Sequence, residues 1–272
     1  MNNWAMGYWG FYKFVASSLV GLMLYVSGLV QTFPARMAQP GPNDPIYKEG
    51  MIYAPILMYH HIAPKIGDNP YYVSPDIFAQ QMAWLKDNHY NVISLEKFYN
   101  GVYGNELLPE KPVVLAFDDG NRDQYTNAVP VMKKYGYTGT FYIITNNVNL
   151  GGYFTWDMLK EMVKDGMDIE SHTVHHPSLG TLDETQNEYE LSKSKEVLES
   201  KLGISVKHLA YPGGSFSNIT IAVLKKLGYL SATTVIHGQY HTKDQSPYKI
   251  HRMHIDSDME SFVGFVTGRR KD

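Results

Sequence analysis

Two adjacent carboxylates follow an apolar run near the middle of the chain. Asp118 and Asp119 come directly after VVLAF (113–117) and before Gly120. Adjacent side chains point in different directions, so one carboxylate can bind a metal ion while the other faces a substrate water. Gly120 permits the tight turn that brings the backbone close to such a site. Taken alone, the triplet also fits the start of a helix, where aspartate is common.

Two histidines further along have the spacing of metal ligands. His172 and His176 are four residues apart in SHTVHH. On one helical turn both imidazoles would face the same side and hold one ion, with His175 pointing elsewhere. A surface histidine cluster is the alternative that this spacing alone leaves open. With Asp119 the set becomes two histidines and one carboxylate, which leaves coordination positions free for water and substrate.

A ligand set of nitrogen and oxygen atoms predicts one divalent metal ion. Zinc is the preferred ion, and cobalt, nickel and manganese also suit these ligands because such a site discriminates weakly. Two histidines and a carboxylate also bind iron(II) in oxygenases. The second carboxylate, Asp118, favours hydrolysis over that alternative because it can activate a water molecule.

The elements that must position these residues alternate between strand and helix. From Met51 onward, about seven β-then-α units follow one another, which predicts a parallel sheet wrapped by helices. The fold expected is a (β/α)7-8 barrel of the TIM type, distorted or incomplete. The polar motifs MYHH, FDDG, SHTVHH and YPGG lie at the carboxyl ends of predicted strands, and HRMH ends the last predicted strand. Because the carboxyl ends of parallel strands meet on one face of a barrel, we expect these motifs to converge there.

Capping residues, glycines and apolar runs set the bounds of the elements. Pro130 lies inside a helix expected to end at Tyr135, so we expect a kink or a late start there. Other helices are expected at about residues 75–88, 155–166, 183–203, 218–227 and 259–266. Strands are expected at residues 51–59, 92–93, 113–117, 139–144, 167–170, 206–211, 230–235 and 248–255.

The text AFDDG followed by SHTVHHP resembles the first two motifs of the polysaccharide deacetylase family, the family-four carbohydrate esterases. The similarity runs from about Pro55 to about Ile255. It implies metal-dependent hydrolysis of N-acetyl groups on an amino-sugar polysaccharide, with release of acetate. It also implies that Asp118 is the general base. The implied metal ligands are Asp119, His172 and His176.

A subgroup of that family is similar in further segments. LMYHHI, NVISLEKF and LPEKPVVLAFDDG resemble the biofilm-type poly-N-acetylglucosamine deacetylases. In that subgroup the general acid is a histidine after the first strand, which implies His60 here and a structural role for His61. His254, on the last predicted strand, is the alternative acid because other family members place theirs at that point. His89, His208, His237 and His241 belong to no recognisable constellation.

The chain departs from the family at its third motif, which is typically R-x-P-Y. Here the segment is Ala210-Tyr211-Pro212-Gly213, so the arginine that orients the base is missing. Arg252 is a candidate replacement from the last strand. Tyr211 is a candidate substrate or oxyanion residue, through a backbone N–H near it. A catalytically impaired, carbohydrate-binding wall module on the same fold is the alternative that this departure favours.

Composition limits the remaining classes. The chain has 272 residues, a net charge of −3 and no cysteine. Disulfides, thiolate metal sites and cysteine catalysis are therefore excluded. A mildly acidic chain does not bind nucleic acid through bulk charge, so the expected partner is an N-acetylated polysaccharide.

The N-terminal segment predicts contact with a membrane. No charged residue lies between Lys13 and Arg36, and Phe14–Val30 is almost wholly apolar. A helix of about 20 such residues spans the hydrocarbon core of a bilayer. We expect residues 1–36 to be a membrane anchor or a signal segment, 37–50 a linker and 51–268 the catalytic domain. The domain would then lie on the extracellular side of the cell membrane, anchored by the helix, or be secreted if the segment is cleaved.

Overall fold

The computed structural model describes residues 51–268. The anchor or signal segment (1–36) and the linker (37–50) predicted above lie outside the described residues. Within residues 51–268 no helix is both long and apolar enough to cross a bilayer.

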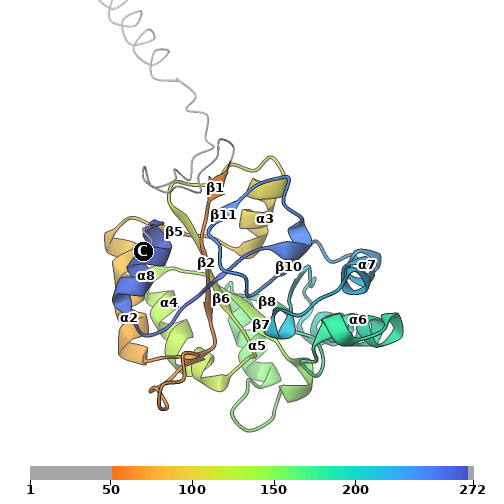
Figure 1. Cartoon of the computed structure of the whole chain (residues 1–272). Helices are drawn as coiled ribbons and strands as arrows, with labels where there is room; N and C mark the ends of the chain where they lie inside the picture. The colour runs from red at the N-terminus through yellow and green to blue at the C-terminus, as the bar shows by residue number, and fades with distance from the viewer. Residues whose placement is uncertain (1–50, 269–272) are drawn as a thin grey trace, which may run out of the picture. The chain divides into compact units, whose positions relative to one another are not determined.

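A curled parallel sheet forms the centre of the fold (Figure 1). Its strands run in the order β10-β9-β8-β7-β6-β2-β12, and β5 pairs with β6. The bounds are β2 (Ile56–Tyr59), β5 (Asn91–Val92), β6 (Pro112–Phe117), β7 (Thr140–Ile143), β8 (Asp168–Ser171), β9 (His208–Ala210), β10 (Ser231–Thr233) and β12 (Met253–His254). All of these pairings are parallel, as the alternation of strands and helices predicts.

One short segment near the C-terminus reaches both edges of the sheet. Ile250 pairs with Thr233 of β10, whereas Met253 and His254 pair with β2. The sheet is therefore curled so strongly that the short segment from Ile250 to His254 connects its two edges. The predicted barrel of the TIM type, distorted or incomplete, is confirmed.

Helices pack against the outer face of the sheet (Figure 1). They are α2 (Pro75–Asp87), α4 (Val129–Tyr135), α5 (Trp156–Lys164), α6 (Glu184–Leu202), α7 (Asn218–Lys226) and α8 (Met259–Thr267). Ser74, Thr155 and Asp183 each accept a hydrogen bond from an otherwise unpaired N–H in the first turn of their helix. These caps explain why the predicted starts of α2, α5 and α6 are correct.

Strand residues alternate between two apolar cores. Leu115 and Phe117 of β6 face the outer helices, whereas Val114 and Ala116 face the interior of the barrel. This alternation follows from the two-residue period of a strand. All six residues of β6 are buried, which is why the strand reads as a continuous apolar run.

Helix α3 (Leu95–Tyr103) was not predicted. Its residues Leu95, Phe98 and Val102 belong to the inner core, so the helix covers the end of the barrel opposite the strand carboxyl ends. The short antiparallel pair of β1 (Ile52–Tyr53) and β11 (Tyr240–His241) lies near it (Figure 1). Burial of its apolar side stabilises α3.

Two predicted strands are shorter than expected. Residues 51–59 divide into β1 and β2, because Pro55 cannot donate a ladder hydrogen bond. Of residues 248–255 only Met253–His254 forms a strand, preceded by the 3-10 turn η5 (Pro247–Lys249). Two further short strands, β3 (His61–Ile62) and β4 (Tyr72–Val73), pair beside the carboxyl end of β2.

The prediction for Pro130 is correct. A π-helical turn, η1 (Gln124–Ala128), precedes α4, and Pro130 falls in the first turn of α4. Proline lacks the N–H that a continuous helix would need at this position, so α4 starts late.

Candidate metal and catalytic site

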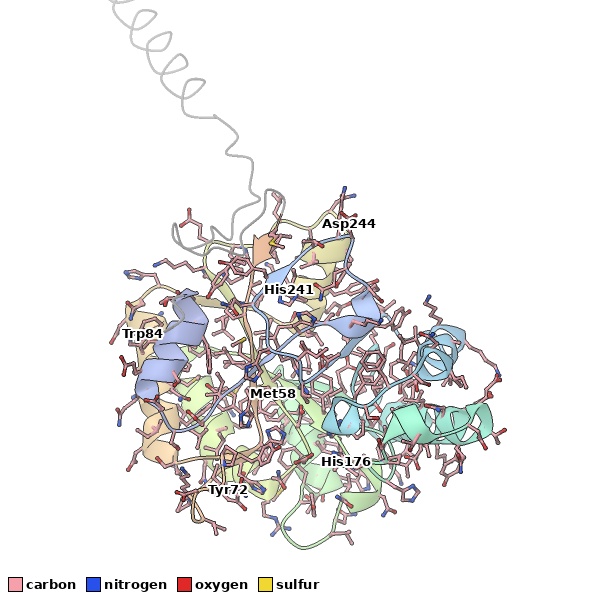
Figure 2. All side chains as sticks on the ribbon, viewed as in Figure 1. Met58, Tyr72, Trp84, His176, His241 and Asp244 are labelled. Carbon is pink, nitrogen blue, oxygen red and sulfur yellow. The ribbon has the colours of Figure 1, made fainter. Side chains whose placement is uncertain are left out.

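The predicted motifs gather around one cavity at the carboxyl ends of the strands. The cavity has a volume of about 520 Å³, and its lining includes His60, Asp118, Asp119, His172, His176, Tyr211 and His254. In Figure 2, Tyr72 and His176 mark this end of the barrel, and His241 lies toward the opposite end.

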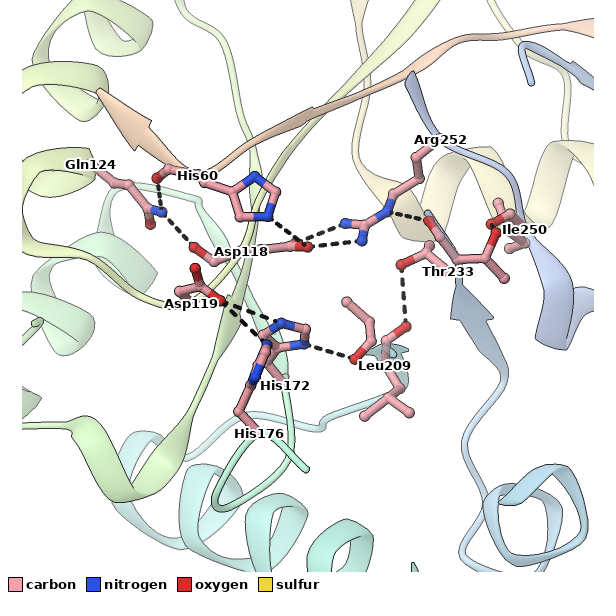
Figure 3. A network of polar contacts seen from close by, with 12 residues as sticks. His60, Asp118, Asp119, Gln124, His172, His176, Leu209, Thr233, Ile250 and Arg252 are labelled. Carbon is pink, nitrogen blue, oxygen red and sulfur yellow. Dashed lines mark hydrogen bonds and ion pairs between the residues drawn. The ribbon is translucent and has the colours of Figure 1, made fainter. Parts of the chain in front are cut away.

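The backbone turns sharply between the two aspartates. Asp119 has φ 73° and Gly120 has φ 76°, both in the left-handed region. The turn sends the Asp118 side chain toward the barrel interior and the Asp119 side chain toward the histidines (Figure 3). Asp118 is buried, whereas the side chain of Asp119 is 26% exposed.

Asp119, His172 and His176 form a candidate metal site. Asp119 Oδ1 lies 3.5 Å from His172 Nε2 and 3.7 Å from His176 Nε2. Ligands bound at about 2.0–2.1 Å around a tetrahedral zinc ion stand roughly 3.3–3.4 Å apart, so small movements would complete the site. His172 Nδ1 donates a 2.8 Å hydrogen bond to the Ala210 carbonyl, which leaves Nε2 for an ion.

The two histidines do not lie on a helical turn, so that part of the prediction is wrong. They lie in a loop after β8, and both Thr173 (φ 68°) and His176 (φ 61°) are left-handed. The Thr173 hydroxyl accepts a hydrogen bond from the His176 N–H at 2.9 Å. This compact turn brings residues four apart to the same side, as a helix would.

Asp118 is paired with Arg252. The guanidinium donates to both carboxylate oxygens, at 2.7 and 2.8 Å, and both side chains are buried (Figure 3). Burial alone would raise the pKa of Asp118, but the charge of Arg252 overrides it and holds the pKa well below its usual range. Asp118 is therefore ionised at neutral pH.

The arginine reaches Asp118 from the segment just before β12. Its Nε donates to the Thr234 carbonyl at 3.0 Å, and its cation lies 5.5 Å from the centre of the Tyr142 ring. These contacts fix the direction of the guanidinium. Arg252 therefore lies where it can orient Asp118, the candidate base, in place of an arginine at position 210.

Both candidate acids line the cavity beside Asp118. His60 Nε2 lies 4.0 Å from Asp118 Oδ2. The rings of His60 and His254 are 5.7 Å apart, and Tyr71 contacts both, at 4.7 and 5.1 Å between ring centres. Burial lowers the pKa of His60 to about 4, although the charges of Asp118 and Asp119 oppose this shift.

His61 has a different set of contacts. Its Nδ1 lies 2.7 Å from Asp123 Oδ2, and its ring stacks on Tyr72. The Ile62 N–H donates to the same carboxylate. These contacts hold the segment after β2 and suit the structural role expected of His61.

The N–H of Tyr211 is already engaged. It donates to the Thr233 carbonyl at 3.1 Å, while the Tyr211 hydroxyl donates to the Tyr248 carbonyl. Gly213, two residues on, also lines the cavity with φ 57°. Its N–H donates to no group among residues 51–268. This donor, in the 3-10 turn η4 (Pro212–Gly214), suits an oxyanion better than the N–H of Tyr211.

Sequence reasoning missed Gln124 and Tyr71. The Gln124 amide donates to the carbonyls of His60 and Asp118, at 2.5 and 2.6 Å, and so links the segments that carry the candidate acid and the candidate base. Tyr71 is half exposed beside the two histidines. Neither residue belongs to a motif, and their partners lie elsewhere in the sequence.

Known proteins are similar to this chain in sequence. Residues 106–232 match the family described as Polysaccharide deacetylase. YxkH of Bacillus subtilis, which carries the same family name, is 32% identical over 205 residues, covering 75% of this chain and 72% of YxkH. The poly-beta-1,6-N-acetyl-D-glucosamine N-deacetylase of Staphylococcus aureus is 32% identical over 203 residues, covering 69% of each chain. The chain belongs to the polysaccharide deacetylase family.

Solved structures agree with the fold. The deacetylase PplD of Streptococcus pyogenes, solved in complex with acetate, superposes with a TM-score of 0.74 at 31% identity, covering 78% of this chain and 97% of PplD. IcaB from Ammonifex degensii shares the fold with a TM-score of 0.71 at 24% identity, covering 80% of this chain and 97% of IcaB.

Proposed function

We propose that this protein hydrolyses N-acetyl groups of a poly-N-acetylglucosamine-type polysaccharide with the help of one divalent metal ion, releasing acetate. The observation that carries the proposal is the side-by-side placement of a buried Asp118–Arg252 pair and the Asp119–His172–His176 set in one cavity. The name of the S. aureus relatives supports the choice of glycan.

The donor atoms fit a small divalent cation. One atom from each of Asp119, His172 and His176 lies within 4.8 Å of the others. An ion bound there would polarise the acetamide carbonyl and lower the pKa of a coordinated water. Zinc is the preferred ion, with cobalt, nickel and manganese as alternatives.

The chain's own residues supply the proton transfers. Asp118 takes the proton of the attacking water, using the lone pairs that Arg252 leaves free. The Gly213 N–H stabilises the carbonyl oxygen as negative charge develops on it. His60 gives a proton to the departing amine. Because burial lowers the pKa of His60 to about 4, His60 must take up a proton after the substrate binds, either the one that Asp118 removed from the water or one from solvent.

The Asp118–Arg252 contact also argues against an impaired binding module. That alternative depended on the missing arginine at position 210, and Arg252 supplies the missing partner from another strand. A module without turnover would have no use for a buried, oriented carboxylate beside the candidate ligands.

Acetate release tests the proposal. Metal-free protein loaded with zinc, cobalt, nickel or manganese is assayed on poly-N-acetylglucosamine, peptidoglycan, chitin oligomers and acetylated xylan. We expect release from poly-N-acetylglucosamine, strongest with one of these ions. His172→Ala should lose stoichiometric metal by elemental analysis, whereas Asp118→Asn should keep it and lose about 10²–10⁴-fold in turnover. Activity of the metal-free protein, or equal metal in His172→Ala, would refute the proposal.

We also propose that the apolar Phe14–Val30 run tethers the protein, with the catalytic domain on the outer side of the membrane. Cell fractionation with N-terminal sequencing tests this. The tether predicts that the protein is found with membranes and that externally added protease reaches the domain. Soluble protein in the medium with a new N-terminus near residue 38 would show a cleaved signal segment instead.

A further inference from the structure

A buried carboxylate on α6 holds the loop that carries both histidine ligands. Glu190 is 7% exposed and lies in the first half of α6, facing the segment between His172 and His176. Its Oε2 accepts hydrogen bonds from the N–H groups of Val174 and His175, each at 2.9 Å. Its Oε1 accepts from His175 Nδ1 at 2.7 Å.

The loop needs such support because its conformation is unfavourable. Thr173 and His176 are both left-handed, which costs a residue with a Cβ about 1–2 kcal/mol. Strained backbone of this kind persists only where surrounding contacts fix it. Two charge-assisted hydrogen bonds to one buried carboxylate are such contacts.

A second set of hydrogen bonds joins the same loop to α6. The Thr173 N–H donates to the Ser171 hydroxyl, which is 2.8 Å from the Ser194 hydroxyl on α6. Ser194 and Glu190 are one helical turn apart, so one face of α6 supports the loop at two points. The backbone contacts made by Glu190 lie between the two ligands.

We propose that Glu190 is a positioning residue for the metal centre. By fixing the N–H groups of Val174 and His175, it holds the imidazoles of His172 and His176 at the separation that one ion requires. Outer-shell partners of this kind commonly contribute about 10–100-fold to metal affinity. The inference rests on the metal centre of the proposed function.

The test uses the whole chain and two measurements. The first is the affinity for cobalt, by competition with a chelating dye. Glu190→Ala should bind cobalt about 10–100-fold more weakly than the wild type. Glu190→Gln keeps one acceptor oxygen and should restore most of the affinity. His175→Ala keeps both backbone donors and should change it by no more than about threefold.

The second measurement is hydrogen exchange of the backbone amides of residues 172–176 in metal-free protein. Glu190→Ala should speed exchange of this segment at least about tenfold, because two amides lose their acceptor. Leu198→Val, a change in the α6 core away from the loop, is the stability control and should leave both readouts unchanged.

The exchange measurement distinguishes failure of the proposed function from failure of the role proposed for Glu190. If wild-type protein binds no metal but Glu190→Ala still speeds exchange, the proposed function fails. The finding that Glu190 fixes the loop between residues 172 and 176 would then still stand. If folded Glu190→Ala has the cobalt affinity and the exchange rates of the wild type, the proposed positioning role of Glu190 is wrong. Should that variant not fold, Glu190→Asp replaces it, because its shorter side chain cannot reach both amides, and the same result would overturn the proposal.

Discussion

At the scale of single residues, Asp118 combines two properties that oppose each other. Its bidentate contact with Arg252 lowers its pKa and so makes it a weak base. The same contact fixes its direction and leaves one lone pair on each oxygen for water. Because Asp118 stays ionised far below neutral pH, an acid limb in the pH–rate profile would report another group.

The choice between His60 and His254 gives a prediction at this scale. An acid matters most when the leaving group is a poor one, so His60→Ala should lose about 10²–10⁴-fold on an acetamide substrate and much less on an activated aryl acetate. Steady-state kinetics on both substrates, with metal content checked, measures the difference.

His254→Ala is the matched variant, because its ring lies in the same cavity. It should affect both substrates alike. If His254→Ala shows the selective loss while His60→Ala behaves like the wild type, the acid lies on β12 and the assignment to His60 fails.

The residues predicted from the sequence were those that lie in short motifs. The sequence alone was enough to recognise four of them, because their residue types and spacing are those of metal ligands and a water-activating carboxylate: Asp118, Asp119, His172 and His176. Glu190 and Gln124 could not be recognised, since their contacts with site residues cross loops and depend on where α6 and η1 pack. The helical turn expected for His172 and His176 was wrong because two left-handed residues give the same side-chain spacing.

At the scale of elements, the π-helical turn η1 links the ends of the paired strands β2 and β6, which are followed by His60 and Asp118, the proposed acid and base. It carries Gln124, which is fully buried and donates to the backbone carbonyls of His60 and Asp118. A wider turn suits a side chain that must reach two segments at once, and such turns often mark functional sites. Pro130, just beyond, favours this local departure from α-helix because it has no N–H to donate.

Gln124→Leu should lower the free energy of unfolding by about 1–3 kcal/mol, because two buried carbonyls lose their donor. We also expect turnover to fall at least about tenfold with metal content unchanged, since His60 and Asp118 are no longer held together. Urea unfolding and acetate release measure the two effects.

Asn187→Leu is the control for stability alone. Asn187 is equally buried and donates to three backbone carbonyls far from the base, those of Leu179, Leu182 and Asp183. It should lose comparable stability and keep its turnover. Equal losses of turnover in both variants would show that Gln124 acts only through stability.

Element order and the carboxyl-end site followed from the sequence, since alternation and capping are local properties. Helix α3 did not, because it is short and its role depends on the open end of the barrel that it covers. The strand expected at 248–255 is only Met253–His254 in the structure. A segment that connects the two edges of a curled sheet can pair with each edge along only part of its length.

At the scale of the whole molecule, buried histidines away from the site make stability depend on pH. Burial lowers the pKa of His208 and of His241 to about 3. His241 is fully buried against Phe98. Because each histidine is protonated more readily in the unfolded chain, their contribution to stability is complete above about pH 6.5 and declines as the pH falls toward 3.

His241→Leu should therefore reduce the loss of stability on acidification. Because His241 stays neutral in the folded state, it lowers the free energy of unfolding by about 2 kcal/mol at pH 5 relative to pH 8. The variant has no histidine at this position and should not show this decrease. Thermal unfolding between pH 8 and pH 4.5 measures the difference. His89→Asn, at an exposed left-handed position that asparagine tolerates, should keep the wild-type pH dependence. Parallel curves for His241→Leu and wild type would contradict the prediction.

If Asp118 is the base, as proposed, its pairing with Arg252 also sets how much of the chain must be synthesised before the site is complete. The two residues are 134 positions apart, and Arg252 belongs to the segment that completes the barrel. A growing polypeptide that ends before residue 252 already contains the aspartate and both histidines that would bind metal. Asp118, the proposed base, would still lack the guanidinium that pairs with it. On the proposed function, deacetylation therefore requires the final strand, and a chain that ends before it would keep the candidate metal ligands without removing any acetyl group.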